Sequence, residues 1–399
     1  MKKFVLAVTM LALTVAIPSA SAQTFTALHQ FNGSLVGGLS DGANPEGALI
    51  RDAAGNLFGT TFAGGIGEGV AFKLDSTGKQ TILFTFNDFV SGGFPASPLI
   101  QDQSGNLYGV ADGGSGGAGV VFRLSQSGDE TLLFQFQGGT GSQPKVPSGG
   151  ILMDKTGTIF GTTLAGGKGN CLFGSGCGTV FRLNTDGTLR VLHNFNGGAG
   201  GSEPLGPLVQ DAAGNLFGVA QQGGNLACAE FPQTGCGTVF KLAKNGQFTV
   251  LHTFQGGADG ASPQAGLFLD ASGNLFGTAM RGGTSENGTV FKIASDGTYT
   301  VLHRFTGTDG TNPNGGLVAD SAGNLFGTTQ IGGRNALGTA YRLDPAGRVK
   351  VLHAFTGGLD GASPLAGVIL DAAGNVYGTA VKNFLIQQVQ GGNVFKITP

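Results

Sequence analysis

The 399-residue sequence has no tryptophan, 4 cysteines and few charged residues, which make up 12% of the chain. Its 22 basic and 24 acidic side chains nearly balance, so the charge gives no sign of nucleic-acid binding. Beyond the N-terminal leader, no apolar run is long enough to span a bilayer. Helical periodicity is also missing. What the sequence has in abundance is glycine, 76 residues without a Gly-X-Y period, which excludes collagen.

The first 22 residues have the composition of a cleaved export signal. Lys2 and Lys3 precede an apolar stretch, and small residues occupy positions 20–22. We expect cleavage after Ala22, which leaves one domain over residues 23–399. The mature chain is therefore predicted to be secreted or periplasmic.

A unit of about 50 residues repeats along the rest of the chain. Its most regular string, Gly-Asn-Leu-Phe-Gly or a close variant, begins at Gly55, Gly105, Gly157, Gly214, Gly273, Gly323 and Gly374. Each copy follows a short apolar run that ends in Asp. A glycine-rich loop, a Thr-Val-Phe-Lys-Leu-like run and a Val-Leu-His-x-Phe-like run come after it. The four runs are short, rich in Val, Thr and aromatics, and bounded by turn residues, which is typical of β-strands.

Four antiparallel strands per unit predict one blade of a β-propeller, because a small sheet cannot bury both faces alone. The fold class is therefore all-β, a seven-bladed β-propeller of four-stranded blades. The units lie near residues 46–86, 97–136, 149–195, 206–254, 265–305, 315–355 and 366–399. The last unit lacks a fourth strand, and residues 24–31 match an isolated fourth strand. We expect these two segments to pair and close the ring, which removes exposed sheet edges.

Residues that recur in every unit are predicted to be structural, because a catalytic group needs to occur only once. Aromatic residues fill one position in strands two, three and four of each unit, which predicts a stacked core. Five histidines share one strand-four slot, where two units have Phe84 and Phe134. The Asp after strand one is expected to cap the next hairpin or to pair with the base of strand three, as for Asp270 and Lys292.

Two further sets of residues have a structural and a metal-binding interpretation. Cys171 and Cys177 lie in one enlarged loop, and Cys228 and Cys236 in the next, which predicts two local disulfides in an exported protein. The other two pairings stay open, and a four-cysteine zinc site is an alternative. The connections with Asp-Gly-x-x-Pro are expected to form turns, with calcium binding as the alternative. Their acidic residues are Asp41, Asp259, Asp309 and Asp360.

Candidate ligand-binding residues are the unrepeated polar ones near the strand-two-to-three loops. These loops share one face of a propeller with the connections between blades, and ligands usually bind there. The position before the Gly-Gly pair varies between units, and its polar members are Asp112, Gln222, Arg281 and Lys382. They are predicted to bind a sugar or a peptide, or to act chemically with Asp112 as base and Arg281 as electrophile. Solvated loop tips are the plainer interpretation.

The unit Gly-Asn-Leu-Phe-Gly-Thr-Thr, then Gly-Gly, Gly-Thr-Val-Phe-Lys-Leu and Thr-Val-Leu-His-x-Phe, resembles the GloVer (Gloeobacter and Verrucomicrobia) tandem-repeat family. The resemblance covers essentially the whole mature chain. It implies export and a repeat architecture, and it carries no established activity. Members often have a C-terminal sorting anchor, and the lack of one after Pro399 favours release or periplasmic residence. A looser likeness links the chain to propellers of the streptogramin lyase group.

These observations predict an exported, monomeric, non-catalytic binding or interaction module. Its expected partner is a cell-envelope glycan or protein, and no cofactor, metal or nucleic acid is expected. The alternative is a lyase or hydrolase with its active site on the axial loop face. The first prediction is favoured because the sequence has no Ser-His-Asp set and no paired carboxylates outside the repeats.

Overall fold

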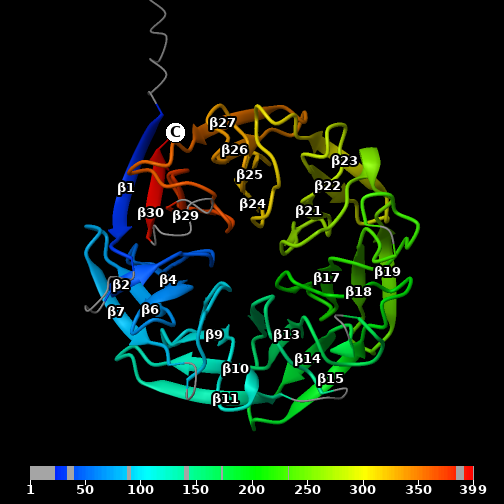
Figure 1. The fold of residues 1–399 in the computed structure, drawn as a ribbon, viewed down its shortest axis with the longest axis horizontal. Helices are drawn as coiled ribbons and strands as arrows, with labels where there is room; N and C mark the ends of the chain where they lie inside the picture. The colour runs from blue at the N-terminus through cyan, green and yellow to red at the C-terminus, as the bar shows by residue number, and fades with distance from the viewer. Residues whose placement is uncertain are drawn as a thin grey trace, which may run out of the picture.

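A computed structural model describes residues 23–33, 40–87, 91–138, 143–171, 174–231, 233–382 and 391–398. The predicted export signal lies outside these residues. Within them, the chain forms seven four-stranded antiparallel sheets that stand as blades around a ring (Figure 1). The predicted all-β, seven-bladed propeller is therefore confirmed. The described part of the chain has no helix with the length and apolarity that crossing a membrane requires.

Each blade has a short innermost strand, two central strands and an outermost strand (Figure 1). Blade 1 contains β3 (Ile50–Arg51), β4 (Leu57–Thr61), β6 (Val70–Leu74) and β7 (Gln80–Thr85). Blade 2 contains β8 (Ile100–Gln101), β9 (Leu107–Ala111), β10 (Gly117–Leu124) and β11 (Glu130–Gln137). Blade 3 contains β12 (Ile151–Met153), β13 (Ile159–Thr163), β14 (Thr179–Leu183) and β15 (Leu189–Asn194).

The other blades repeat this order from the inside outward. Blade 4 contains β16 (Val209–Gln210), β17 (Leu216–Ala220), β18 (Thr238–Leu242) and β19 (Phe248–Thr253). Blade 5 contains β20 (Phe268–Leu269), β21 (Leu275–Ala279), β22 (Thr289–Ile293) and β23 (Tyr299–Arg304). Blade 6 contains β24 (Val318–Ala319), β25 (Leu325–Thr329), β26 (Thr339–Leu343) and β27 (Val349–Ala354). A small additional sheet pairs β2 (Ser40–Ala43) with β5 (Ala63–Gly65).

Blade 7 closes the ring with strands from both ends of the chain. It contains β28 (Ile369–Leu370), β29 (Val376–Val381), β30 (Gly392–Thr398) and, outermost, β1 (Thr24–Phe31). Thr24 pairs with Thr398, and Phe31 pairs with Gly392, in an antiparallel ladder. β1 and β30 lie side by side in Figure 1. The predicted closure is therefore confirmed.

Aromatic side chains hold neighbouring blades together. A Phe at the end of each outermost strand, or directly after it, packs edge-on against the aromatic residue of the third strand in the next blade, with ring centroids 5.1 to 5.5 Å apart. The pairs are Phe31–Phe72, Phe86–Phe122, Phe136–Phe181, Phe195–Phe240, Phe254–Phe291, Phe305–Tyr341 and Phe355–Phe395. Such a pair contributes roughly 0.5–1.5 kcal/mol beyond the burial of its surface. The predicted aromatic core therefore forms the contacts between blades.

The glycine at the centre of each second strand makes room for this aromatic ring. Gly277 pairs directly with Phe291 across the ladder. A Cβ on Gly277 would lie 2.5 Å from Cζ of Phe291 and 2.9 Å from Cδ2 of Leu267, which is closer than carbon atoms can pack. The same crowding occurs at Gly59, Gly109, Gly161, Gly218, Gly327 and Gly378. The glycine of the repeated Leu-Phe-Gly string is thus required by packing.

The repeated Asp after strand one caps the hairpin that follows it. Asp270 Oδ1 accepts hydrogen bonds from the N–H groups of Ser272 (2.9 Å) and Asn274 (2.8 Å), and Oδ2 accepts one from the Asn274 amide (2.7 Å). The amine of Lys292 instead lies over the ring of Phe276, 5.6 Å from its centroid. Among the described residues, no ion pair joins Asp270 to Lys292. The capping prediction is confirmed. Lys292 acts on Asp270 only as a more distant charge that helps to lower its pKa.

We expect the substitution Gly277→Ala to destabilise the protein by about 1–3 kcal/mol, because the added methyl group must displace the Phe291 ring. The free energy of unfolding, measured by urea denaturation, tests this. Gly200→Ala is the matched control, since a Cβ there meets its nearest atom at 3.6 Å. Equal effects of the two substitutions would contradict the packing argument.

The hairpin caps also predict loss of stability in acid. Burial of Asp270 opposes its ionisation, but the hydrogen bonds from Asn274 and Ser272 outweigh this and lower its pKa from 3.8. Because the folded pKa lies below the unfolded one, the contribution is present above pH 3.8 and is lost as the pH falls further. We expect Asp270→Ala to cost about 1 kcal/mol at pH 6. The gap between variant and wild type, followed by thermal unfolding, should shrink below pH 3.8, and a constant gap would contradict this account.

Candidate functional site

A short proline-containing connection enters each blade and is held by its neighbour. The residue before each proline is left-handed, as at Asn44, whose φ is 53°. This conformation is costly before proline, but here the Asn44 N–H donates a 2.9 Å hydrogen bond to the Gly391 carbonyl of blade 7. The corresponding residues in the other blades are Phe94, Val146, Glu203, Ser262, Asn312 and Ser363. The connections therefore hold the residues that follow the prolines in fixed positions.

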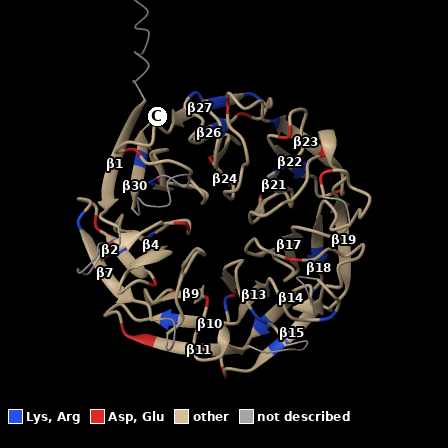
Figure 2. Cartoon of the chain, in the orientation of Figure 1, with Lys and Arg blue, Asp and Glu red and all other residues tan. Residues whose placement is uncertain are grey.

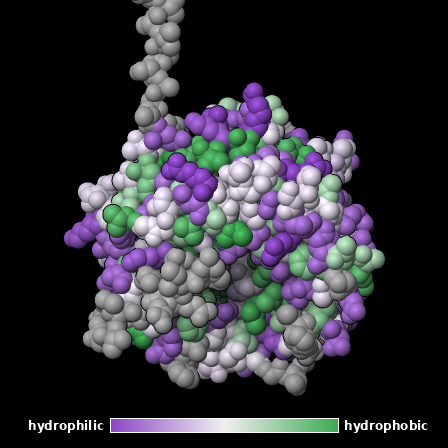
Figure 3. All heavy atoms as spheres, turned by 45° about the horizontal axis from the view of Figure 1, so that its top comes forward, coloured by the Kyte–Doolittle hydropathy of each residue, from purple (hydrophilic) through white to green (hydrophobic). Residues whose placement is uncertain are grey.

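These residues line a cavity of about 410 Å³. All seven blades contribute to its wall, so the cavity surrounds the axis of the ring. Figure 3 shows a hollow near the middle of the molecule with hydrophobic side chains beside it. Small residues and backbone form much of the wall, and charged residues are few in the loops nearest the axis (Figure 2). Its volume is within the range of small-molecule sites, about 300–1,000 Å³.

The residue directly after the proline breaks the sevenfold symmetry of the cavity. In blade order, this position holds Glu46, Ala96, Ser148, Leu205, Gln264, Asn314 and Leu365. Because the surrounding backbone is the same in every blade, these side chains make the cavity chemically uneven around the axis.

Glu46 is the one ionisable side chain among the described residues that line the axial cavity. Burial raises its pKa to about 7. Within the described part of the chain, no hydrogen bond or ion pair engages its carboxyl group. At neutral pH the group therefore exists in both protonation states, so that it can donate a hydrogen bond as an acid or accept one as a carboxylate.

Neutral polar groups and aliphatic side chains complete the lining. The hydroxyl groups of Ser97 and Ser148 are buried and have no hydrogen-bond partner among the described residues. The amides of Gln264 and Asn314 come from two neighbouring blades. The cavity thus offers uncharged donors and acceptors together with apolar contacts, and a buried hydroxyl without a partner favours a ligand that supplies one.

The four predicted binding residues lie away from this cavity. Asp112, Gln222 and Arg281 each form a main-chain bridge with the connection that enters the same blade. Asp112 and Arg281 belong to blades 2 and 5, with two blades between them, and none of the four residues lines the axial cavity. The structure therefore does not bring Asp112 and Arg281 together as base and electrophile.

Lys382 is out of register with the other three residues. In blade 7 the bridge is formed by Val381, which pairs with Ala362, and Lys382 is the exposed residue after it. The following segment, residues 383–390, lies outside the described residues. The register of this position could not be read from the sequence, because the number of residues between the second-strand glycine and the bridge differs between blades.

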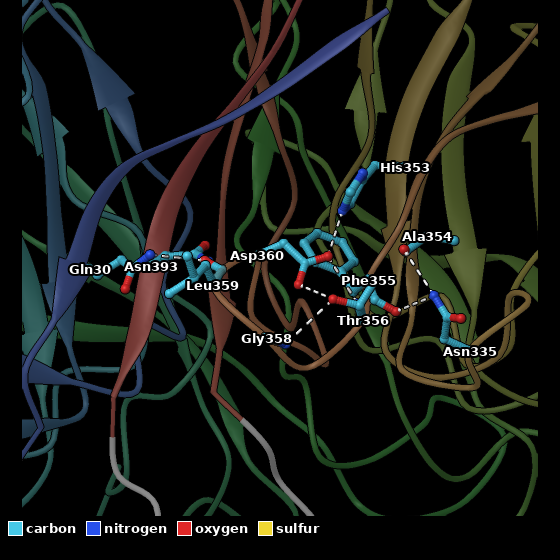
Figure 4. A network of polar contacts seen from close by, with 10 residues as sticks. All are labelled: Gln30, Asn335, His353, Ala354, Phe355, Thr356, Gly358, Leu359, Asp360 and Asn393. Carbon is cyan, nitrogen blue, oxygen red and sulfur yellow. Dashed lines mark hydrogen bonds and ion pairs between the residues drawn. The ribbon is translucent and has the colours of Figure 1, made fainter.

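The strand-four histidines tie their strands to the connections. His353 Nε2 lies 2.8 Å from Oδ2 of Asp360, and the Thr356 hydroxyl donates a 2.6 Å hydrogen bond to Oδ1 of the same carboxylate (Figure 4). The carbonyl of Leu359, the residue before Asp360, accepts hydrogen bonds from Gln30 and Asn393 of blade 7. Equivalent pairs are His29–Asp41, His252–Asp259 and His303–Asp309. Asp259, Asp309 and Asp360 therefore lie in a 3-10 turn, a bend and a turn, as predicted, whereas Asp41 lies in β2. Each of the four is paired with a histidine.

Both local disulfides are present. Cys171 pairs with Cys177, with Cα atoms 4.8 Å apart, and Cys228 pairs with Cys236, with Cα atoms 5.8 Å apart. The predicted local pairings are therefore confirmed. Two disulfides are typical of a protein from an oxidising compartment.

One feature of the sequence points to the axial residues, although the predicted site residues lie elsewhere. The position after the connection proline varies from unit to unit, while the proline itself and the Leu, Ile or Val four residues after it recur. A position that varies between otherwise similar repeats is not fixed by the fold, which indicates that its side chains serve function. The sequence alone does not show that the residue after the proline lies closer to the ring axis than the residue before Gly-Gly.

Comparisons with known proteins agree with the repeat architecture. The pattern of the Gloeobacter/Verrucomicrobia repeat matches residues 14–172 and 227–399. Among solved structures, the extracellular domain of a hybrid two-component system from B. thetaiotaomicron is similar in fold, with 10% identity, a TM-score of 0.56, and coverage of 92% of this chain and 39% of that chain. A gluconolactonase from Xanthomonas campestris has 14% identity, a TM-score of 0.46, and coverage of 95% and 90%. None of the curated proteins matches the sequence.

We expect Glu46→Gln to stabilise the protein in mildly alkaline solution. The folded pKa of about 7 lies above the ordinary glutamate pKa of 4.5, so ionisation of Glu46 costs stability as the pH rises through this interval. The glutamine cannot ionise and avoids this cost. Thermal unfolding of both proteins should give a difference in Tm at pH 8 that disappears near pH 4.5. A difference of the same size at both pH values would show that the carboxyl group is not desolvated by the cavity.

Proposed function

The chain belongs to the Gloeobacter/Verrucomicrobia repeat family. We propose that it is an exported, non-catalytic binding module that takes a cell-envelope glycan into its axial cavity. The family and the two disulfides support a place in an oxidising compartment. The proposal includes a monomeric state, since one propeller contains the whole cavity.

The lining of the cavity carries the proposal. Hydroxyl and amide groups from Ser148, Gln264 and Asn314 match the hydroxyl groups of a sugar, while Leu205 and Leu365 match its apolar ring faces. One ionisable group in the lining gives little attraction for a highly charged peptide. We therefore favour a glycan over a protein segment as the ligand.

Glu46 supports a second candidate, a hydrolase or lyase. A carboxyl group with a pKa of about 7 is suited to general acid–base catalysis near neutral pH. Most glycoside hydrolases, however, use a pair of carboxyl groups, and the described lining contains Glu46 alone. The binding module is therefore the better-supported function.

We expect oligosaccharides from bacterial cell envelopes, screened on an array, to include a ligand whose affinity depends on the axial residues. Calorimetric titration should give at least about tenfold weaker binding for Asn314→Ala and Glu46→Ala, because each removes a buried polar contact worth about 1.4 kcal/mol. Arg281→Ala, an exposed substitution outside the cavity, should bind as the wild type does.

The mass of the ligand recovered after incubation with the protein distinguishes the binding module from the enzyme. A binding module is expected to leave this mass unchanged. Conversion of the ligand by the wild type but not by Glu46→Gln would replace the proposal by the enzyme. Loss of binding in Arg281→Ala with full binding in Asn314→Ala would place the site elsewhere on the propeller.

A further inference from the structure

A second cavity lies between blades 3 and 4, near the opposite ends of the strands from the axial cavity. It has a volume of about 570 Å³, whereas corresponding cavities between blades 1 and 2 and between blades 5 and 6 each measure about 430 Å³. The hairpin after strand one of blade 3 and both hairpins of blade 4 border it. We call it the 3/4 groove.

Two lysines in the 3/4 groove have no counterpart elsewhere in the ring. Lys155 is the second residue of its hairpin, and the other six blades have Ala53, Gln103, Ala212, Ala271, Ser321 and Ala372 at this position. Lys244 occupies the second position of the strand-three-to-four hairpin, where the other hairpins have Ser76, Gln126, Thr185, Ser295 and Pro345. They come from different blades and different hairpins, yet both line this one groove.

Comparison of the seven blades shows which residues the fold requires at a given position. Six blades fold with a small or neutral residue at the position of Lys155, so the positive charge there is not a requirement of the hairpin. The same argument applies to Lys244. Two independent departures from the repeat that meet in one cavity indicate a function for that cavity.

The contacts of these lysines leave their charges available. The aliphatic stem of Lys244 covers Gly214, where a Cβ would lie 3.1 Å from its Cδ. Both lysines are exposed, and neither forms an ion pair with a described residue. Arg182, the repeated base of blade 3, adds a third cation to the lining.

The acidic groups of the groove are largely occupied. Both oxygens of Asp211 accept hydrogen bonds from Asn215. In blade 3, Thr158 replaces the usual Asn, and Oδ1 of Asp154 accepts hydrogen bonds from the Thr156 hydroxyl and from two N–H groups. Three cations and two carboxylates leave the lining with a net positive charge.

The floor of the groove is apolar. Phe160 and Leu192 of blade 3 face Leu216 and Leu242 of blade 4 within the core between these blades. A ligand that fits both parts needs an apolar body and an anionic end, because a small hydrophilic anion would leave the floor uncovered.

We propose that the 3/4 groove binds an organic anion with an apolar body, its carboxylate or phosphate group held by Lys155, Lys244 and Arg182. The site is separate from the axial cavity and does not depend on the function proposed for that cavity. The two lysines supply the selectivity for negative charge, and the half-buried side chains of Phe160 and Leu192 supply most of the apolar contact area.

Calorimetric titration of the full chain with decanoate and with decyl phosphate, below the concentrations at which they form micelles, tests the proposal. We expect one molecule per chain to bind with a Kd below about 1 mM. The comparison of the two probes shows which anionic group is preferred. Decyl maltoside and decyltrimethylammonium, which have the same tail with a neutral or a positive head, should bind at least about tenfold more weakly.

The double variant Lys155→Ala/Lys244→Ser should bind the preferred anionic probe at least about tenfold more weakly. It introduces residues that other blades have at these positions, so the fold is expected to be retained. Lys79→Ala/Lys350→Ala removes the same charge from exposed lysines outside the groove and should bind like the wild type, as should Glu46→Gln.

Equal binding of anionic and neutral probes, equal loss in the two double variants, or no binding of either anionic probe near 1 mM would each overturn the proposal. Loss of anion binding in Glu46→Gln would move the site to the axial cavity and would also overturn it.

Discussion

The edge-on contact between an outermost-strand phenylalanine and the aromatic ring of the next blade is the interaction on which the rest of the structure depends. It recurs at each junction, including Phe31 with Phe72, where the ring closes. The ring it contacts needs space above the neighbouring strand, and a glycine such as Gly59 provides that space. One aromatic residue and one glycine per unit therefore explain much of the repeated string, because neither can change without the other.

The sequence was sufficient to predict the fold because the repeat states the same information seven times. Strand lengths, turn residues and the unmatched segment 24–31 together specified the blades and their closure. The sequence predicted that each Asp has a polar partner. Only the structure shows that the partner of Asp270 is Asn274 and not Lys292. Both partners satisfy a carboxylate, and only the register of the strands decides which one is within reach.

The candidate site was harder to predict because its residues lie in connections and not in strands. The left-handed residue before each proline sets the direction of the next side chain, and a left-handed Glu203 or Phe94 has no sequence signature. Glu46 therefore looked like an ordinary loop residue, although burial raises its pKa to about 7. Because the scaffold is repeated, the positions that differ between blades give the axial cavity and the 3/4 groove their distinct chemistry.

The pairing of β1 with β30 has a consequence for the order of folding during synthesis. β1 is among the first described segments to leave the ribosome, and its partner strand is the last. Until then, Phe31 has no third strand of its own blade beside it, and blade 1 has one uncovered flank. The half-built ring therefore presents an apolar surface for nearly the whole time of translation, and a holding chaperone that covers this flank would protect the nascent chain from association with its neighbours.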